Sequence, residues 1–459
     1  IRIDYTNMLA GAVSGGIDDD SWADAAERFR AAHAAVVEQH ARGTLGFLDL
    51  PDDTTLHHAV TDFVAARRGH YDDVVVLGIG GSALGPIALR TALRSPGWNT
   101  LGDAERGGWP RLHVLDNVDP RTIGTLLDRL RLDRALFVVT SKSGSTAETM
   151  AQFLVVHERL RRALGDGLAR QLVFVTDPAA GALRALAGTL GVPALDVPSN
   201  VGGRFSVLTP VGLLPAALAG IDTGELLAGA ADMRTRCAPA ALAHNPAGVF
   251  ATLQWLADTR AGRHVHVLMP YSDALRDLAD WFVQLWAESL GKIDAAGRSV
   301  GPTPLAALGA TDQHSQVQLF MEGPHDKTVC FVAVEAREAD VAIPHAFPDV
   351  RELAYLGGHT LGELLDVERR ATAGALARRG RPNMTITVER VDAWHLGGMF
   401  MLFELATAYA GHLYGVNAFD QPGVELGKQF TYAMLGRADA DAARAEWERL
   451  PRPDPRFVV

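Results

Sequence analysis

Cysteine is almost absent from this sequence, with Cys237 and Cys330 its only two. Two cysteines without paired spacing provide neither a disulfide framework nor the ligands of a zinc knuckle. The alternating His264 and His266 lack a third ligand at metal-site spacing, so we interpret them as packing residues and expect no metal site. A reducing cytoplasm is the compartment that best fits this cysteine usage.

Long hydrophobic runs and an excess of positive charge are also missing. No stretch reaches the roughly 18 apolar residues of a membrane span, and no signal-like segment is seen. The chain has 43 Lys and Arg against 54 Asp and Glu, a net charge of −11, which argues against nucleic acid or an anionic membrane as a partner. An anionic substrate must therefore be met by a few local cations.

What the sequence does contain is an alternation of strand-like and helix-like periods. Its 459 residues, 48% of them hydrophobic, are enough for two or three domains with proper cores. The expected strands are 74–77, 111–115, 136–140, 171–176, 194–197, 264–269, 328–334 and 384–388. Helical periods lie between them, which predicts an α/β fold with two doubly wound, mainly parallel sheets flanked by helices. Helical segments are expected at both ends, including residues 1 to about 50.

Two polar loops follow apolar strands. Residues 74–85, VVVLGIGGSALG, predict a buried strand, a glycine turn and a helix with Ser82 at its start. Residues 134–150, RALFVVTSKSGSTAETM, repeat this construction. Unpaired amides and the dipole at a helix start attract anions, and glycine lets an anion approach the backbone closely. Because ligands collect at the carboxyl ends of parallel strands, we expect the two loops to hold one phosphate between them.

Four further stretches place charged or polar groups beside glycines. They are NVGGRFSVLT at 200–209, WFVQLWAESLGK at 281–292, TDQHSQVQ at 311–318 and FDQPGVELGKQ at 419–429. In the second stretch, Gln284 and Glu288 are one turn apart on the same face of an otherwise apolar helix. A guanidinium after two glycines, as at Arg204, can bring a fixed fork of donors close to a substrate.

Spacing alone leaves plain structural alternatives open for each of these groups. Glu288 can be a solvated or ion-paired carboxylate, and His314 an exposed histidine. Arg204 can bridge two domains, and Lys428 can cap helix carbonyls. The hydroxyl-rich turn at 141–146 equally suits an ordinary helix cap.

Taken together, the motifs are similar to those of the glucose-6-phosphate isomerase family, whose two halves are sugar isomerase (SIS) domains. The resemblance covers about residues 70–430. It is carried, in the expected order, by GIGGSALG, SKSGSTAET, NVGGRFSVLTPVGLLPAALAGID, ESLGK, DQHSQVQLFMEGP and NAFDQPGVELGK. It implies an N-terminal helical segment packed on the second domain (1–55), a first SIS domain (56–220), a second SIS domain (221–415) and a C-terminal segment with the lysine motif (416–459).

The resemblance assigns catalytic roles residue by residue. Glu288 matches the base that moves a proton between C1 and C2 of the sugar, and Arg204 matches the group that stabilises the enediolate. His314 and Lys428 match the pair that assists ring opening and closing. The catalytic set is completed by Gly203, beside the arginine, and by Glu148, a carboxylate that orients the histidine.

The same resemblance implies the substrate contacts and the reaction. The matched contacts are Gly81, Ser82, Ser141, Lys142, Ser143, Thr146, Gln284 and Gln421. The implied reaction is the reversible conversion of glucose 6-phosphate to fructose 6-phosphate in glycolysis and gluconeogenesis, through ring opening and a cis-enediol, without metal or other cofactor. In the family the histidine reaches the site from the partner subunit, so a homodimer is implied.

These residue types suit that chemistry. An imidazole and an ammonium can exchange protons with the ring oxygen and O1 near neutral pH. A carboxylate whose pKa is raised by an apolar helix can act as the base on one face of a planar intermediate. A fixed guanidinium stabilises the negative charge that develops beside it.

Two other classes of function remain open from the sequence. A nicotinamide-dependent dehydrogenase is one, because Gly78, Gly80 and Ala83 satisfy the loose dinucleotide fingerprint, although the gap to Asp116 is longer than usual. The other is a non-catalytic SIS module that senses a sugar phosphate, although such a module has no use for a base such as Glu288. Tight NADH binding favours the first, and absence of turnover favours the second.

Overall fold

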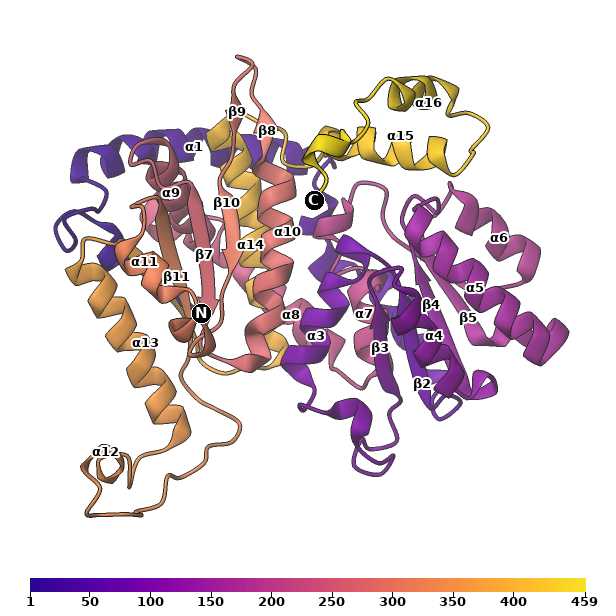
Figure 1. Ribbon diagram of the computed structural model, residues 1–459, viewed down its shortest axis with the longest axis horizontal. Helices are drawn as coiled ribbons and strands as arrows, with labels where there is room; N and C mark the ends of the chain where they lie inside the picture. The colour runs from indigo at the N-terminus through magenta and orange to yellow at the C-terminus, as the bar shows by residue number, and fades with distance from the viewer. The chain divides into compact units, whose positions relative to one another are not determined.

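The computed structural model describes residues 1–459 and contains two five-stranded sheets with helices on both faces (Figure 1). The predicted α/β fold class is confirmed. The chain divides into a large body, Ile1–Ala418, and a C-terminal segment, Phe419–Val459. None of its helices combines the length and the apolar character needed to cross a membrane.

The first sheet is entirely parallel, with the strand order β3-β2-β4-β5-β6. Its strands are β2 (Asp73–Leu77), β3 (Arg111–Leu115), β4 (Ala135–Thr140), β5 (Leu172–Thr176) and β6 (Ala194–Asp196). Three of them, β2, β4 and β5, are buried along their whole length, which explains their unbroken apolar runs.

Helices cover both faces of this sheet. The helices on one face are α4 (Pro120–Arg129), α5 (Ala147–Leu164) and α6 (Ala182–Leu190). Those on the other side are α2 (Thr54–Ala65), α3 (Leu84–Leu93) and α7 (Pro210–Leu218). Because β3 and β4 lie on opposite sides of β2, the strand order reverses between β2 and β4. A crevice at such a reversal is where doubly wound sheets bind ligands.

The second sheet has the order β1-β12-β11-β7-β10. Its strands are β1 (Arg2–Asp4), β7 (Val265–Pro270), β10 (Thr303–Ala306), β11 (Lys327–Val334) and β12 (Asn383–Val388). The parallel strands β10-β7-β11-β12 repeat the order of the first four strands of the other sheet. The expectation that residues 1 to about 50 are helical was wrong for β1, which pairs antiparallel with β12. Three residues are too few to show a strand period.

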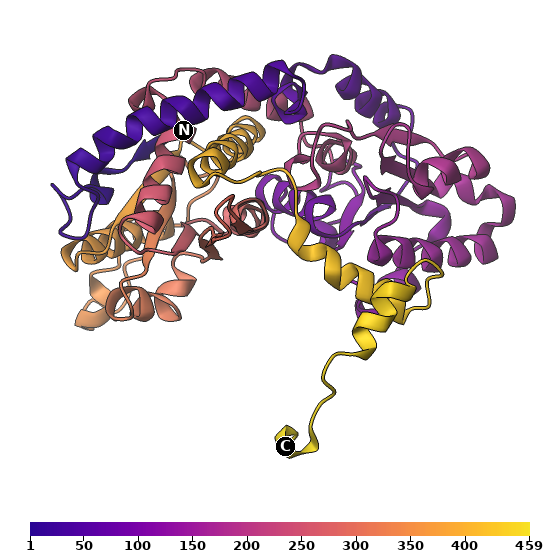
Figure 2. The ribbon, with the colours of Figure 1, turned by 90° about the horizontal axis from the view of Figure 1, so that it is seen from above.

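The helices of the second half enclose its sheet. One face packs against α11 (Val317–Glu322) and α13 (Leu361–Arg378). The remaining helices are α1 (Asp19–Ala41), α8 (Thr223–Arg236), α9 (Pro246–Thr259), α10 (Arg276–Leu290), α12 (Arg351–Ala354) and α14 (Ala393–Tyr414), with a hairpin of β8 (Lys292–Ile293) and β9 (Ser299–Val300). Figure 2 shows α1, in indigo, running along the outside of this half, where it packs on α9 and α14.

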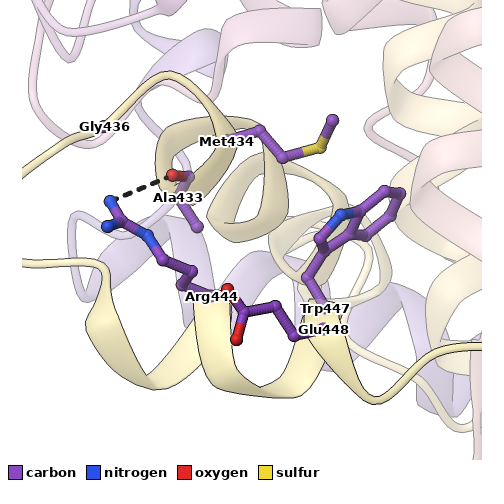
Figure 3. A pocket seen from close by; sticks show the side chains of 6 residues that line it. All are labelled: Ala433, Met434, Gly436, Arg444, Trp447 and Glu448. Carbon is purple, nitrogen blue, oxygen red and sulfur yellow. Dashed lines mark hydrogen bonds between the residues drawn. The ribbon is translucent and has the colours of Figure 1, made fainter.

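The C-terminal segment consists mainly of α15 (Glu425–Met434) and α16 (Asp441–Glu448). Phe430 and Trp447 join the two helices with ring centroids 5.4 Å apart. A small open pocket between the helices is lined by Ala433, Met434, Gly436, Arg444, Trp447 and Glu448 (Figure 3). A guanidinium nitrogen of Arg444 donates to the carbonyl of Ala433 at 3.3 Å, so the one positively charged side chain of this pocket stabilises the local backbone.

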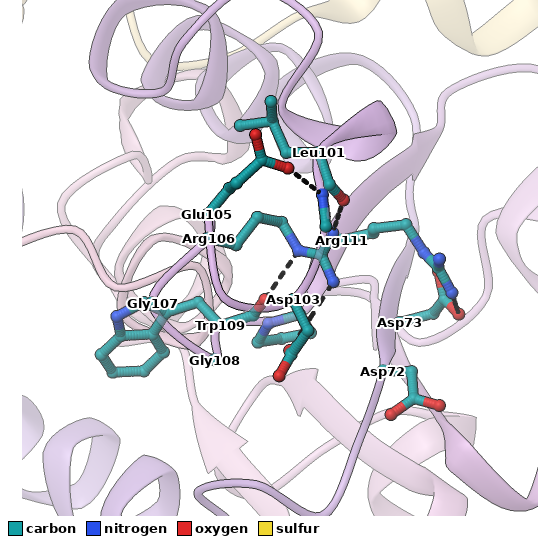
Figure 4. A network of polar contacts seen from close by, with 12 residues as sticks. Asp72, Asp73, Leu101, Asp103, Glu105, Arg106, Gly107, Gly108, Trp109 and Arg111 are labelled. Carbon is teal, nitrogen blue, oxygen red and sulfur yellow. Dashed lines mark hydrogen bonds and ion pairs between the residues drawn. The ribbon is translucent and has the colours of Figure 1, made fainter.

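A buried carboxylate anchors the start of β2. The Asp73 side chain is 2% exposed and accepts two hydrogen bonds of 2.6 Å from Arg111 (Figure 4). It also forms a hydrogen bond of 2.9 Å with His113. Burial alone raises the pKa of Asp73, but the hydrogen bonds from Arg111 and His113 outweigh it and hold the pKa at about 2. The ionised form is therefore favoured by the folded state.

We expect Asp73→Asn to lower the free energy of unfolding by about 2–3 kcal/mol near pH 7, since an unfolded Asp has a pKa of about 3.9. A depressed pKa contributes stability above the unfolded value, and that stability is lost as the pH falls toward 2. The difference between variant and wild type should therefore shrink between pH 4 and pH 2, as measured by denaturant titration. The control Asp128→Asn, which breaks an exposed 2.9 Å pair with Arg159, should change stability by less than about 1 kcal/mol. A pH-independent effect of the Asp73 variant would contradict this account.

Candidate active site

The first polar loop leaves β2 at the point where the strand order reverses. It forms a short 3-10 turn, η4 (Gly80–Ser82), before α3 begins. Gly80 has φ +55°, a conformation that favours glycine, and a Cβ there would lie 2.8 Å from Nε2 of Gln284. No side chain caps the N-terminus of α3. The turn therefore combines a helix start that no side chain caps with the close approach of a side chain from α10.

The second loop leaves β4, on the other side of the reversal. Ser141 is buried, and its hydroxyl lies 3.0 Å from that of Thr146. Thr146 occupies the N-cap position of α5, yet its side chain accepts no hydrogen bond from the helix amides. The interpretation of this turn as an ordinary cap is therefore wrong. Hydroxyls of Ser143 and Ser145 complete the loop at 3.2 Å from one another.

A third loop brings an arginine against the first. In η8 (Gly203–Phe205), the carbonyl of Gly203 is packed so closely on Gly81 that a Cβ at Gly81 would overlap it and lie 2.8 Å from the Arg204 amide nitrogen. Arg204 is 4% exposed and donates from Nε to Oγ of Ser289 at 2.6 Å. A second nitrogen donates to the carbonyl of Ala418. These bonds fix the plane of the guanidinium.

Helix α10 supplies a carboxylate to the same place. Oε1 of Glu288 lies 3.8 Å from a guanidinium nitrogen of Arg204, and the carboxylate is 25% exposed. Gln284, one turn earlier, donates from Nε2 to Oε2 of Glu288 at 3.0 Å. The prediction that these two side chains share one face of α10 is confirmed. Glu288 is thus held from two sides while part of it faces solvent.

The comparisons with known proteins match this architecture. A family model described as phosphoglucose isomerase matches residues 57–449. A glucose-6-phosphate isomerase of Carboxydothermus hydrogenoformans is 44% identical over all of this chain and 99% of that protein. One of Rubrobacter xylanophilus is 48% identical over 95% of this chain and 98% of that protein.

The chain belongs to the phosphoglucose isomerase family.

Solved structures agree with this membership. A protein of Thermus thermophilus described as hypothetical has a TM-score of 0.83 at 40% identity, covering 95% of this chain and 99% of that one. A glucose-6-phosphate isomerase of Chlamydia trachomatis, at 23% identity, shares the fold with a TM-score of 0.71 over 85% of this chain and 75% of that one. Membership in the phosphoglucose isomerase family decides against a dinucleotide-binding dehydrogenase.

Some residues that the resemblance assigned are not joined to this group by any hydrogen bond. His314 ends η11 (Thr311–His314), is exposed, and has no side-chain hydrogen bond within its own chain. Glu148 lies in the first turn of α5, and no hydrogen bond links it to His314. Their roles as phosphoglucose isomerase residues remain predictions.

The two assigned residues of the C-terminal segment also remain predictions. Lys428, on α15, donates from Nζ to Glu425 at 2.8 Å. Gln421 immediately precedes the short helix η12 (Pro422–Val424).

Lys142 has an unexpected environment. Its Nζ donates to the backbone carbonyls of Ser199 and Val201, each at 2.7 Å. Burial lowers the pKa of Lys142. The Lys142 ammonium therefore binds a neighbouring backbone segment, residues 199–201.

Two further outcomes concern residues outside the assigned set. His266 is fully buried and accepts a 3.1 Å hydrogen bond from the Trp286 indole, and burial lowers its pKa to about 4, which fits the packing role predicted for it.

The sequence did not predict a role for Ser289, which holds Arg204. The only signal for it was its position next to Glu288 in ESLGK, and nothing in that motif indicates which way the hydroxyl points.

We expect Gly81→Ala to destabilise the protein by about 1–3 kcal/mol, because the added methyl group would overlap the backbone of Gly203. The matched control is Gly124→Ala on α4, where a Cβ would meet nothing within 4 Å and alanine is the better helix former. Thermal unfolding of both variants is the measurement. Equal midpoints for the two variants would show that the two loops do not need their close approach.

Proposed function

We propose that this protein interconverts glucose 6-phosphate and fructose 6-phosphate as a step of glycolysis and gluconeogenesis in the cytoplasm, without a metal. The observation that carries the proposal is the cluster of Glu288, Gln284 and Arg204 against the loop after β2, where Gln284 lies against Gly80 and the Gly203 carbonyl packs on Gly81. Relatives up to 48% identical are named glucose-6-phosphate isomerase, which supports isomerisation of this sugar phosphate. Cys237 and Cys330, both free and buried, fit a reducing compartment.

In the proposed site the phosphate is bound by hydroxyls and amides. The hydroxyls of Ser82, Ser141, Ser143 and Thr146 and the backbone at Gly81 belong to loops that precede helices whose N-termini lack side-chain caps. Such amides and the helix dipoles favour an anion. The phosphate is remote from the reacting carbons, so its binding energy fixes their position.

Proton transfer between C2 and C1 is assigned to Glu288. A carboxylate oxygen removes the proton from C2 of the open-chain aldose, which gives an enediolate. A proton then passes from O2 to O1, and the carboxyl group of Glu288 returns its proton to C1 on the same face, which gives the ketose. The negative charge that develops on the enediolate oxygens is stabilised by Arg204, whose guanidinium is already oriented by Ser289. Gln284 holds Glu288 in place and offers its amide to the sugar.

Ring opening is assigned to His314 and Lys428, with Glu148 orienting the imidazole and Gln421 contacting the sugar. Opening a hemiacetal requires one proton to leave O1 and one to reach the ring oxygen, which an imidazole and an ammonium can exchange near neutral pH. We propose that His314 acts in the site of a second copy of the chain. Its exposure and its lack of a hydrogen-bond partner in its own chain support this assignment.

An uncovered apolar segment supports a homodimer. Between β11 and α13 the chain forms an excursion that contains α12 and stands away from the sheet (Figure 1). Its large exposed hydrophobic side chains include Phe347 (67% exposed), Tyr355 (68%) and Val341 (58%). A run of such side chains on one segment is typical of a surface that another protein covers.

The first test is a coupled assay on fructose 6-phosphate with EDTA present. We expect the intact protein to turn over, and Glu288→Gln to reduce turnover by about 10²–10⁴-fold, the range for loss of a general base. Glu158→Gln is the control, because Glu158 pairs only with Arg161 and Arg162 on the surface of α5. Absence of turnover in the intact protein would refute the proposed function. Full turnover in Glu288→Gln would show that Glu288 is not the base.

The second test asks whether His314 acts in the site of its own chain or in the site of the partner chain. Glu288→Gln and His314→Ala are each expected to be inactive, and mixing them by unfolding and refolding should restore about a quarter of wild-type activity. The reason is that half of the dimers are hybrids and each hybrid rebuilds one intact site if the histidine crosses the interface. If His314 acts within its own chain, every site carries one lesion and no activity returns. Size-exclusion chromatography with light scattering checks that dimers are present.

A further inference from the structure

The ammonium of Lys142 lies inside the fold of the neighbouring loop. Lys142 follows Ser141 in the loop after β4, and its Nζ donates to the carbonyls of Ser199 and Val201 at 2.7 Å each. An ammonium has three N–H donors, and charge-assisted bonds of this length are stronger than neutral ones. Two of the three donors are therefore committed to residues 199–201.

The segment that Lys142 holds is also held from its other side. The Asn200 side chain donates to the carbonyl of Gly43 at 2.9 Å, and the Gly46 amide donates to the Asn200 carbonyl at 3.3 Å. Val201 is 1% exposed. Residues 199–201 are thus fixed between Lys142 and the turn at 43–46.

This segment leads directly into the arginine loop. Gly203 and Arg204 come two and three residues after Val201, and the Gly203 carbonyl packs on Gly81. Arg204 in turn lies 3.8 Å from Glu288. A shift of Val201 would therefore be transmitted through one short stretch of backbone to the guanidinium.

We propose that Lys142 is a positioning residue, which fixes residues 199–202 and through them the guanidinium of Arg204, and does not bind the phosphate through its side chain. The inference rests on the proposed function. In this arrangement the phosphate is held by the hydroxyls of the loop and the amides of α5. The side chain of Lys142 then joins the loop that binds the phosphate to the segment that orients Arg204.

The test compares ligands that differ at the reacting carbons. Inorganic phosphate probes the anion site alone, and a hexitol 6-phosphate adds a sugar chain that is uncharged at C1 and C2. A five-carbon aldonate 5-phosphate carries a carboxylate where the enediolate charge develops, so it alone needs Arg204. Dissociation constants for all three are measured by isothermal titration calorimetry for the intact protein and for Lys142→Met, together with kcat and KM.

We expect Lys142→Met to lower kcat by about 10²-fold, the usual consequence of a group displaced by about 1 Å. The affinity for the aldonate phosphate should fall by about tenfold more than that for the other two ligands, which corresponds to the loss of one well-placed charged hydrogen bond. Inorganic phosphate should bind within about threefold of its wild-type affinity, since its hydroxyl and amide ligands remain. A merely structural role would not separate the three ligands.

Two further variants keep the proposal falsifiable. Lys142→Arg retains the charge but has a planar fork in place of a single nitrogen, so we expect kcat to fall while phosphate affinity is kept. Lys327→Met is the matched control, because Lys327 is a buried lysine that donates to the Pro324 carbonyl at 3.0 Å at the start of β11. It should lower stability without changing the ratio of ligand affinities.

The outcomes are distinct. A parallel loss of affinity for all three phosphates in Lys142→Met, with kcat kept, would make Lys142 a direct phosphate ligand and overturn the proposal. Unchanged kcat and unchanged affinity ratios in both Lys142 variants would overturn it as well. Absence of turnover in the intact protein would instead refute the proposed function, and the three binding constants would still show whether Lys142 affects the carboxylate ligand selectively.

Discussion

The site depends on one close approach between two backbone segments, Gly81 against the carbonyl of Gly203. Without a side chain at Gly81, the loop after β2 and the loop that carries Arg204 come into direct contact. Arg204 can then be buried at 4% exposure, pinned by Ser289, and still stand beside Glu288. The loop after β2 and the pair of Arg204 and Glu288 are thereby held at a fixed separation, as a site that must orient a ligand requires.

The same strand order in both sheets explains where these loops lie. Among the parallel strands of each sheet, the first in sequence, β2 or β7, has its successor on one side and the third strand on the other, so the strand order reverses there in both sheets. The first sheet places its glycine and serine loops there. The second half contributes α10, which packs on α3 and carries Glu288 and Gln284 toward the loops. One site therefore draws on two halves of similar design.

Much of this was predictable from the sequence, because buried parallel strands and amphipathic helices leave strong periodic signals. The strand at 74–77 and the shared face of Gln284 and Glu288 were found in this way. The four-residue strand β10 (Thr303–Ala306), which contains Pro304, is too short to give such a signal. The hydrogen bonds of Lys142 join residues 57 and 59 positions apart, and their geometry is set by the packing of loops. No local pattern encodes such contacts.

The pairing of β1 with β12 has a consequence for synthesis on the ribosome. Arg2 is paired with Thr387, so the edge of the second sheet is completed only after the residues of β12 have been made. The first sheet, formed between Asp73 and Asp196, has no such requirement and can fold while the opening residues still lack their partner. Translation therefore favours an order in which the half with the first sheet folds early, and the late pairing of residues 2–4 completes the other half.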